Sequence, residues 1–255
     1  MVKKLIILGI DGMDFDVVMK YKNELPNMYK LMKQNNFPKL RSVFPADTTP
    51  AWSTIYTGND PSVHGIINFV NVGAKTNAYK PLTFDDSAFK GKTFWDVLNN
   101  NGMSCAVLLP MNIKEGWEIN GLMITRPYEG KIRVYPENKK DIYCPRYDIL
   151  GTEGKFTSEK DLLTLKDEFF AKVQEEIRLT REVIKNENVD VLFSYFSTTD
   201  GIQHDFWRHC DSTHPEYPGK NKYENVIRDM YIVMDNYIGE IMQEYPDTPL
   251  LIMSD

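Results

Sequence analysis

Four short stretches of the sequence are continuously apolar, and they constrain the fold more than any other feature. They are residues 5–10, 105–109, 189–196 and 250–253. A strand with one solvated face alternates apolar and polar residues, whereas a strand buried on both faces of a parallel sheet is apolar throughout. The sequence therefore predicts a central, mostly parallel β-sheet that is covered on both faces.

Segments with a helical period lie between these runs. Apolar residues recur at intervals of three or four residues, or their multiples, over 162–184 and 226–241. Shorter helices are predicted at 16–35, 50–57 and 93–101. Strands that alternate with helices imply right-handed crossovers and an α/β fold with helices on both faces of the sheet.

The composition is that of a folded chain with a sizeable core. Of its 255 residues, 42% are hydrophobic and 26% are charged, which suits one large domain. The segment 126–157 breaks the rhythm of strands and helices because it is rich in Tyr, Pro, Gly and charged residues. We expect a single domain over 1–255, with 126–157 as a candidate inserted cap or a long loop near a site.

Charge and cysteine content narrow the classes of partner. The net charge of −6 and the pI near 5.4 argue against nucleic acid as a partner. We expect no membrane partner, since the apolar run at the N-terminus ends at Asp11 without a cleavage site and no other run is long enough to span a bilayer. The three cysteines lack metal-ligand spacing, so reduced thiols in a cytoplasmic protein are expected. The sequence sets no oligomeric state.

Aspartates follow three of the four apolar runs. They are Asp11, Asp200 and Asp255, and His204 follows Asp200 by one helical turn. Ligands of an open parallel sheet bind outside the carboxyl ends of its strands, so these carboxylates can converge. Converging carboxylates need a cation, because repulsion and desolvation otherwise raise their pKa values and destabilise the fold. Taken singly, each aspartate is better read as a turn or helix-cap residue, so a metal site and structural roles both stay open.

The segment FPADTTPAWSTIYTG, residues 44–58, places Thr48 and Thr49 directly before Pro50 and the predicted helix 50–57. Unpaired N–H groups and the positive end of the dipole at a helix N-terminus favour an anion such as phosphate. A threonine hydroxyl becomes a nucleophile when a divalent cation lowers its pKa. The simpler alternative is a helix N-cap, which is the better interpretation of an arbitrary Thr-Pro stretch.

Four motifs, taken in order, resemble the alkaline phosphatase superfamily, in particular its type I phosphodiesterase and nucleotide pyrophosphatase branch. They are GIDGMD at 9–14, FPADTTPAWSTIYTGNDPSVHGI at 44–66, TTDGIQH at 198–204 and LLIMSD at 250–255. In that branch the nucleophile is a threonine two residues before a proline, followed by T-G and then H-G-I. Thr48, Thr57-Gly58 and His64-Gly65-Ile66 match this pattern, and the resemblance covers essentially the whole chain.

The resemblance implies a phosphoric ester hydrolase with two divalent metal ions, usually zinc, with manganese as an alternative. One ion would be held by Asp11, Thr48 and Asp255, and the other by Asp200 and His204. Thr48 would attack the phosphorus of a small-molecule phosphate ester, and the resulting phosphothreonine would then be hydrolysed. Two cations roughly 3.5–4 Å apart can stabilise the entering and leaving oxygens of such a displacement.

The sequence departs from the family pattern at two positions other than the nucleophile itself. Many relatives have lysine where this chain has Asp47. Relatives also have an asparagine twenty-one residues after the nucleophile, where this chain has Phe69, so the neighbouring Asn68 is the candidate for binding a phosphoryl oxygen. His64 is expected to be structural, and Trp52 either packs in the core or stacks on the substrate.

The resemblance also bears on the length of the chain. The family motif continues as S-D-H-G, whereas this sequence ends at Ser254-Asp255. We therefore expect a fragment of a longer protein, with an incomplete catalytic domain that lacks further histidine ligands. Two functions stay open: a phosphodiesterase or nucleotide pyrophosphatase-like hydrolase, or else a non-catalytic phospholigand-binding module or inactive truncated homologue. The leaving group is not determined by the sequence.

Overall fold

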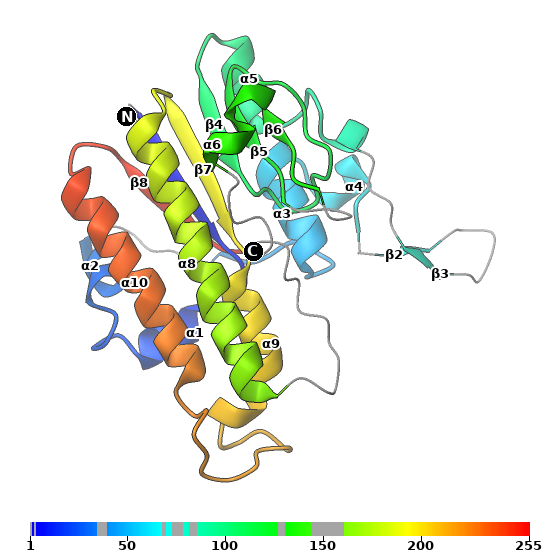
Figure 1. Cartoon of the computed structure of the whole chain (residues 1–255). Coiled ribbons are helices and arrows are strands. Elements are labelled where there is room, and N and C mark those ends of the chain that lie inside the picture. The colour runs from blue at the N-terminus through cyan, green and yellow to red at the C-terminus, as the bar shows by residue number, and fades with distance from the viewer. Residues whose placement is uncertain are drawn as a thin grey trace.

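A six-stranded β-sheet with the strand order β6-β5-β4-β7-β1-β8 lies at the centre of the computed structural model (Figure 1). The structure describes residues 2, 4–34, 40–67, 70–72, 79–81, 86–126, 131–143 and 161–255. The strands of this sheet are β1 (Leu5–Ile10), β4 (Cys105–Leu108), β5 (Gly121–Ile124), β6 (Val134–Tyr135), β7 (Val191–Phe196) and β8 (Leu250–Met253). All neighbouring strands are parallel except β5 and β6, which are antiparallel.

The predicted apolar runs are all strands of this sheet. β1 and β8 have the predicted bounds, while β4 is one residue shorter than its run and β7 begins two residues later than its run. Every residue of β7 is buried, which explains why the run shows no alternation. β5 and β6 were not predicted, because four and two residues carry too little pattern. The mostly parallel α/β fold is confirmed.

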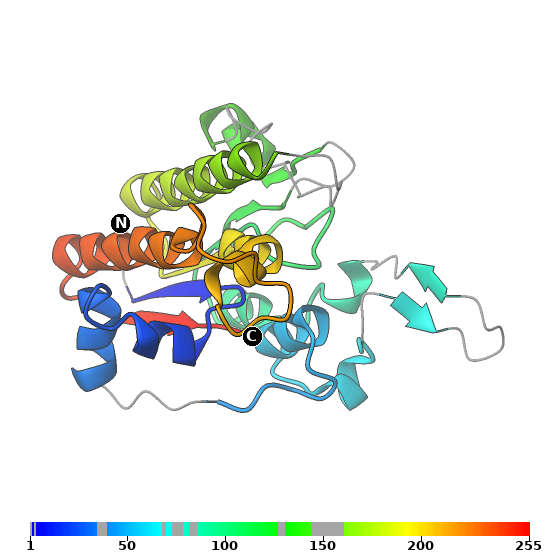
Figure 2. The same cartoon turned by 90° about the horizontal axis from the view of Figure 1, so that it is seen from below.

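Helices cover both faces of the sheet, as predicted. Helices α8 (Leu162–Asn186), α9 (Thr198–Cys210) and α10 (Val226–Glu244) lie on one face, and α3 (Thr48–Thr57) and α5 (Phe94–Asn100) lie on the other (Figures 1 and 2). Ile6, Leu8 and Ile10 of β1 point into the core beneath α8 and α10, whereas Ile7 belongs to the second core with the aromatic residues of α3 and α5. Alternate residues of one strand therefore face different helical layers.

The predicted helix at 16–35 is wrong as a single element. The structure has α1 (Phe15–Lys20) and α2 (Pro26–Gln34) instead. Proline has no N–H and clashes with the preceding helical turn, so it begins a helix more readily than it continues one. Asp235 of α10 accepts hydrogen bonds from the backbone N–H groups of Asn27 and Met28 at 3.2 and 2.7 Å, and this fixes the start of α2.

The long helices α8 and α10 are amphipathic. Val173 and Ile177 of α8 and Ile238 of α10 are buried, while Arg181 and Glu240 form an ion pair at 2.5 Å between the two helices. Within the described ranges, no helix combines the length and the apolar character needed to cross a membrane.

Short elements connect these layers. They are α4 (Pro61–His64), η1 (Asp86–Ala88), η2 (Glu137–Lys139), α6 (Lys140–Tyr143) and the antiparallel hairpin of β2 (Val70–Val72) and β3 (Tyr79–Pro81). The hairpin projects from the body of the molecule (Figures 1 and 2).

The described part of the candidate cap 126–157 contributes β6, η2 and α6. Glu187, which follows α8, accepts hydrogen bonds from the Tyr143 hydroxyl and the Lys139 ammonium, both at 2.5 Å. Residues 127–130 and 144–157 lie outside the described residues, so the cap stays a prediction.

Gly9 leaves an open space on the face of β1 that points toward α3. A Cβ atom at this position would lie 2.7 Å from Cη2 and 2.8 Å from Cζ3 of Trp52. The indole ring is fully buried. Trp52 therefore packs directly against the backbone of β1, and only glycine leaves room for it at residue 9.

We expect Gly9→Ala to lower the free energy of unfolding by about 1–3 kcal/mol, the usual range for overpacking a core, as measured by urea denaturation. The control is the same substitution in a Trp52→Phe background, since phenylalanine lacks the two colliding atoms. Gly9→Ala should be less destabilising in that background. An equal loss of stability in both backgrounds would show that the indole does not set the requirement for glycine.

Candidate active site

The carboxyl ends of three adjacent strands bring the predicted aspartates to one edge of the sheet. Asp11 follows β1, Asp255 follows β8, and Asp200 lies in the first turn of α9, which follows β7. The N–H of Gly12 donates to Oδ1 of Asp255 at 3.0 Å. A Cβ atom on Gly12, whose φ is +63°, would lie 3.1 Å from Oδ1 of Asp200. Gly12 is thus flanked by both carboxylates, and Figure 1 shows the C-terminus beside the start of α9.

Asp11 is the most buried carboxylate of the group, with 3% of its surface exposed. Its Oδ1 accepts a hydrogen bond from Nε1 of Trp52 at 2.8 Å, and its Oδ2 accepts one from the hydroxyl of Tyr195 at 2.5 Å. Burial raises the pKa of Asp11 well above its ordinary value, and repulsion from Asp255 raises it further, while the two donated hydrogen bonds oppose the rise. Both oxygens are therefore held in fixed directions, with lone pairs left for another partner.

Helix α3 begins at Thr48, two residues before the predicted start at Pro50. The reason is Asp47, which caps the helix by accepting a hydrogen bond from the N–H of Thr49 at 3.1 Å. The structure thus shows that Asp47 is the N-cap of α3. Neither Thr48 nor Thr49 caps the helix, which was the simpler interpretation of the sequence. Thr48 is half-buried, whereas Thr49 is fully buried and its hydroxyl has no hydrogen-bond partner among the described residues.

Trp52 connects this helix start to Asp11. It follows Thr48 by four residues, so the two side chains lie on one face of α3. Helical side chains also lean toward the helix N-terminus, which directs the indole over the turn that contains Thr48. The hydrogen bond from Trp52 to Asp11 therefore holds the first turn of α3 near the carboxyl end of β1.

Glu176 of α8 fixes the start of α9. Its Oε1 accepts hydrogen bonds from the N–H and the hydroxyl of Ser197 at 3.2 and 2.9 Å, and its Oε2 accepts one from the hydroxyl of Thr198 at 2.8 Å. Glu176 and Thr198 are both buried. The first turn of α9, which carries Asp200, is consequently anchored to a neighbouring helix.

Asp200 and His204 lie one turn apart on α9, with 3.3 Å between Oδ1 and Nε2. The His204 side chain is 63% exposed and that of Asp200 is 32% exposed. Burial raises the pKa of Asp200; the nearby His204 opposes this rise, and repulsion from Asp255 adds to it. The imidazole of His204 is therefore the more solvent-exposed of the two side chains.

The donor types at this edge suit a divalent cation, because carboxylate oxygens and an imidazole nitrogen are ordinary ligands of zinc and manganese. Asp11 and Asp200 each have a pKa that is raised in part by Asp255, so the carboxylates repel one another in the absence of a cation. The described ranges hold no group of three or more His, Cys, Asp or Glu side chains placed to hold a metal ion. The structure therefore shows neighbouring donors without an assembled three-ligand cage.

His64 has a structural role in the turn after α4, as expected. The N–H of Ile66 donates to Nδ1 at 3.1 Å, so the proton of the neutral ring is on Nε2, which lies 3.0 Å from the hydroxyl of Thr54. Burial lowers the pKa of His64. Asn68 and Phe69 lie outside the described residues, so the phosphoryl-binding role of Asn68 stays a prediction.

Three residues around Asp11 and its partner Tyr195 have roles that the sequence did not show. The buried Trp52 can donate to Asp11 but cannot stack on a substrate. Tyr195 is the penultimate residue of an apolar strand and carried no separate signal. Arg126 follows β5, which was not predicted, and its Cζ lies 5.2 Å from the centroid of the Tyr195 ring.

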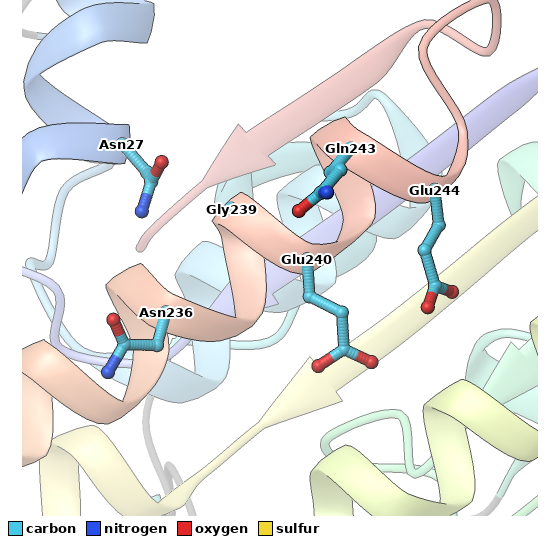
Figure 3. Close-up of a pocket in the computed structure, with 6 residues that line it drawn as sticks. All are labelled: Asn27, Asn236, Gly239, Glu240, Gln243 and Glu244. Atoms are coloured by element: carbon cyan, nitrogen blue, oxygen red, sulfur yellow. The ribbon is translucent and has the colours of Figure 1, made fainter.

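A surface hollow of about 600 Å³ lies away from this site, between α2 and α10 (Figure 3). It is lined by Asn27, Asn236, Gly239, Glu240, Gln243 and Glu244. This end of α10 leads into β8, whereas Asp255 follows β8, so the hollow is at the opposite edge of the sheet. Glu240 already pairs with Arg181, and the amide of Asn27 bonds to Asp235. The hollow is therefore not a candidate active site.

Two similar proteins bear on the family and the fold of this chain. The chain is 27% identical over 139 residues to human ectonucleotide pyrophosphatase/phosphodiesterase family member 1, a match that covers 50% of this chain and 14% of the human protein. The structure is similar to phosphonoacetate hydrolase from Sinorhizobium meliloti 1021, solved in complex with phosphonoacetate, with a TM-score of 0.57 and 16% identity. That match covers 95% of this chain and 53% of the other chain, so this chain spans about half of the length of the solved structure.

The family comparison covers almost the whole sequence. The sequence profile described as type I phosphodiesterase / nucleotide pyrophosphatase matches residues 5–255. The resemblance drawn from the four motifs is thus confirmed, including the placement in the alkaline phosphatase superfamily. The chain belongs to the type I phosphodiesterase / nucleotide pyrophosphatase family.

Proposed function

We propose that this protein is a metal-dependent hydrolase of phosphoric esters, of the phosphodiesterase or nucleotide pyrophosphatase type, with Thr48 as its nucleophile. Membership of the family supports the reaction class. The substrate is a small-molecule phosphate ester. Cys105 and Cys210 are free thiols in the described part of the chain, which agrees with a cytoplasmic location.

The hydrogen bond from Trp52 to Asp11 is the single observation that carries this proposal. It joins the helix that begins at Thr48 to the carboxylate at the end of β1, although the two bonded residues are 41 positions apart in the chain. A nucleophile and an acidic group that can hold divalent ions are the two parts that the proposed mechanism uses. The proposal assigns both parts to one edge of the sheet.

Metal binding is assigned to the same edge. We assign Asp11, Thr48 and Asp255 to one divalent ion and Asp200 and His204 to a second, with zinc as the expected ion and manganese as the alternative. Such ions, when bound, lower the pKa of a coordinated hydroxyl and neutralise charge on the phosphoryl group. The mutual repulsion of the carboxylates supports this assignment, because a cation would turn that repulsion into attraction.

The residues of the chain itself orient the reacting groups. Trp52 and Tyr195 fix the two oxygens of Asp11, and the N–H of Gly12 holds Asp255. We assign the attack to the hydroxyl of Thr48 in the first turn of α3, where the Asp47 carboxylate offsets the positive end of the helix dipole. Asn68 would donate a hydrogen bond to a phosphoryl oxygen.

A second candidate function is a phospholigand-binding module that does not turn over its ligand. The observation that favours it is the lack of an assembled three-ligand cage among the described residues. Such a module would bind phosphate through the same edge of the sheet but would release it unchanged.

We expect Thr48→Ala to reduce the turnover of bis(p-nitrophenyl) phosphate by at least about 10³-fold, since loss of a nucleophile removes the covalent step. Thr49→Val is the matched control. It replaces a buried hydroxyl, unpartnered among the described residues, with a methyl group of the same shape, so turnover should stay within about threefold. Full turnover by Thr48→Ala would rule out Thr48 as the nucleophile.

Removal of divalent ions distinguishes the proposed hydrolase from the phospholigand-binding module. Dialysis against a chelator is expected to abolish hydrolysis of bis(p-nitrophenyl) phosphate, and added zinc or manganese should restore it. The measurement is release of p-nitrophenol. A zinc-loaded protein that binds inorganic phosphate in calorimetry but releases no p-nitrophenol would favour the binding module.

Asp200 should make the metal-free protein less stable at neutral pH. Its pKa is higher in the folded state than in the unfolded chain, so the folded state binds more protons between the two values, and stability falls as pH rises through that window. We therefore expect metal-free Asp200→Asn to melt at a higher temperature than the unsubstituted protein at pH 8, with the difference vanishing below about pH 4. Zinc should stabilise the variant less than the unsubstituted protein.

A control variant is expected to shift the melting temperature in the opposite direction. Hydrogen bonds from Ser104 lower the pKa of Asp190, so Asp190→Asn should melt at a lower temperature at pH 8. An equal zinc-induced rise in melting temperature for Asp200→Asn and the unsubstituted protein would remove Asp200 from the proposed metal site.

A further inference from the structure

Arg126 extends from the carboxyl end of β5 toward the candidate active site. The preceding residue, Thr125, is buried and paired with Arg133: its N–H donates to the Arg133 carbonyl at 3.0 Å, and its hydroxyl accepts from the Arg133 N–H at 3.1 Å. This pairing fixes the backbone from which Arg126 departs. The guanidinium lies over Tyr195 of β7, with Cζ 5.2 Å from the ring centroid, although β4 separates β5 from β7 in the sheet.

The Tyr195 ring connects this cation to the acidic group. The ring is fully buried, and its hydroxyl donates to Oδ2 of Asp11 at 2.5 Å. The guanidinium lies over the ring, whereas Asp11 is bonded at the hydroxyl end of the same ring. Arg126 also opposes the rise in the pKa of Tyr195 and of Tyr56, which shows that its positive charge reaches this buried aromatic layer.

The charge around the site makes a cation useful there. Three carboxylates lie at this edge of the sheet, and Asp47 adds a fourth at the start of α3, where it already accepts the N–H of Thr49. Without bound cations, an anionic ester approaching this edge meets repulsion from every one of these groups. A guanidinium carries five N–H donors in a planar fork that suits oxyanions.

We propose that Arg126 is a substrate-positioning residue whose guanidinium binds a second oxyanion of the substrate, outside the phosphoryl group that is attacked. This inference rests on the proposed function. Because the guanidinium lies over the Tyr195 ring and the ring's hydroxyl bonds Asp11, we assign Arg126 to an oxyanion beside the reacting phosphoryl group. The protein therefore prefers phosphoric esters that carry an additional negative charge, from either a carboxylate or a phosphate.

The test uses three substrates with the same reacting centre and leaving group. They are p-nitrophenyl ethyl phosphate and its two analogues in which the ethyl group ends in a carboxylate or in a phosphate. Arg126→Gln keeps a planar group that can stack on Tyr195 but removes the charge, and Arg126→Lys keeps the charge but loses the fork. Arg133→Gln is the control, since Arg133 lies on the same ribbon and pairs with Glu115 at 2.7 Å.

We expect Arg126→Gln to raise the KM of both charged substrates at least about 10-fold, the effect of losing a charged hydrogen bond. The kcat values and the KM of the ethyl ester should stay within about threefold. Arg126→Lys should retain part of the preference for the two charged substrates. Arg133→Gln should retain all of this preference. An equal change in KM for all three substrates, or no change, would overturn the inference, and a purely structural role would lower the melting temperature without discriminating among substrates.

A binding experiment keeps this inference separate from the proposed function. Zinc-loaded protein is titrated with ethylphosphonate and with 2-carboxyethylphosphonate, neither of which has an ester to hydrolyse. Arg126→Gln should weaken the binding of 2-carboxyethylphosphonate at least about 10-fold and leave that of ethylphosphonate unchanged. If the unsubstituted protein hydrolyses none of the three esters, the proposed function fails, and this titration still decides the role of Arg126. Equal weakening for both phosphonates, or none, would overturn that role.

Discussion

The hydrogen bond between the indole of Trp52 and the carboxylate of Asp11 is the interaction on which the arrangement of the site depends. Asp11 is almost fully buried, and a buried carboxylate without donors is strongly unfavourable, so the fold must supply partners. Trp52 supplies one from α3 and Tyr195 supplies the other from β7. The bond forms only because Gly9 lets the indole lie against the backbone of β1. Glycine in the strand, tryptophan in the helix and aspartate at the strand end are therefore one unit, and this unit determines where the helix that begins at Thr48 lies.

The acidic edge of the sheet is unfavourable for the isolated chain and is held together by contacts from elsewhere. Burial and mutual repulsion raise the pKa values of Asp11 and Asp200. Ionisation of these two carboxyl groups therefore destabilises the folded state. The N–H of Gly12 holds Asp255, and buried Glu176 fixes the start of the helix that carries Asp200. An arrangement that destabilises the fold and is nevertheless over-determined by its surroundings is typical of functional sites.

The sequence predicted the parts of this structure that follow from local pattern. Four strands were evident because buried runs of four to six residues cannot be mistaken for amphipathic segments, and the strand-end rule placed the aspartates at one edge. Helix α3 begins two residues earlier than predicted, because Asp47, rather than a threonine, caps it. Tyr195 and Arg126 could not be found in this way, because their proximity depends on the strand order β5-β4-β7-β1, which no local pattern encodes. The role of Asn68 falls on residues that the structure does not describe.

Asp47 has a consequence for the charge of the site, beyond its role as the helix cap. A helix N-terminus attracts anions through its unpaired N–H groups and its dipole, but here Asp47 occupies one N–H and brings a negative charge to the same place. Pro50 removes another donor from the first turn, because proline has no N–H. The start of α3, which carries the proposed nucleophile Thr48, therefore has little electrostatic attraction for an anionic ester. Positive charge must come from bound cations or from another element. Arg126 is such a group, because its guanidinium lies over the Tyr195 ring. Our proposal accordingly assigns selection among anionic substrates to Arg126 at the end of β5, a strand outside the motif that contains Thr48.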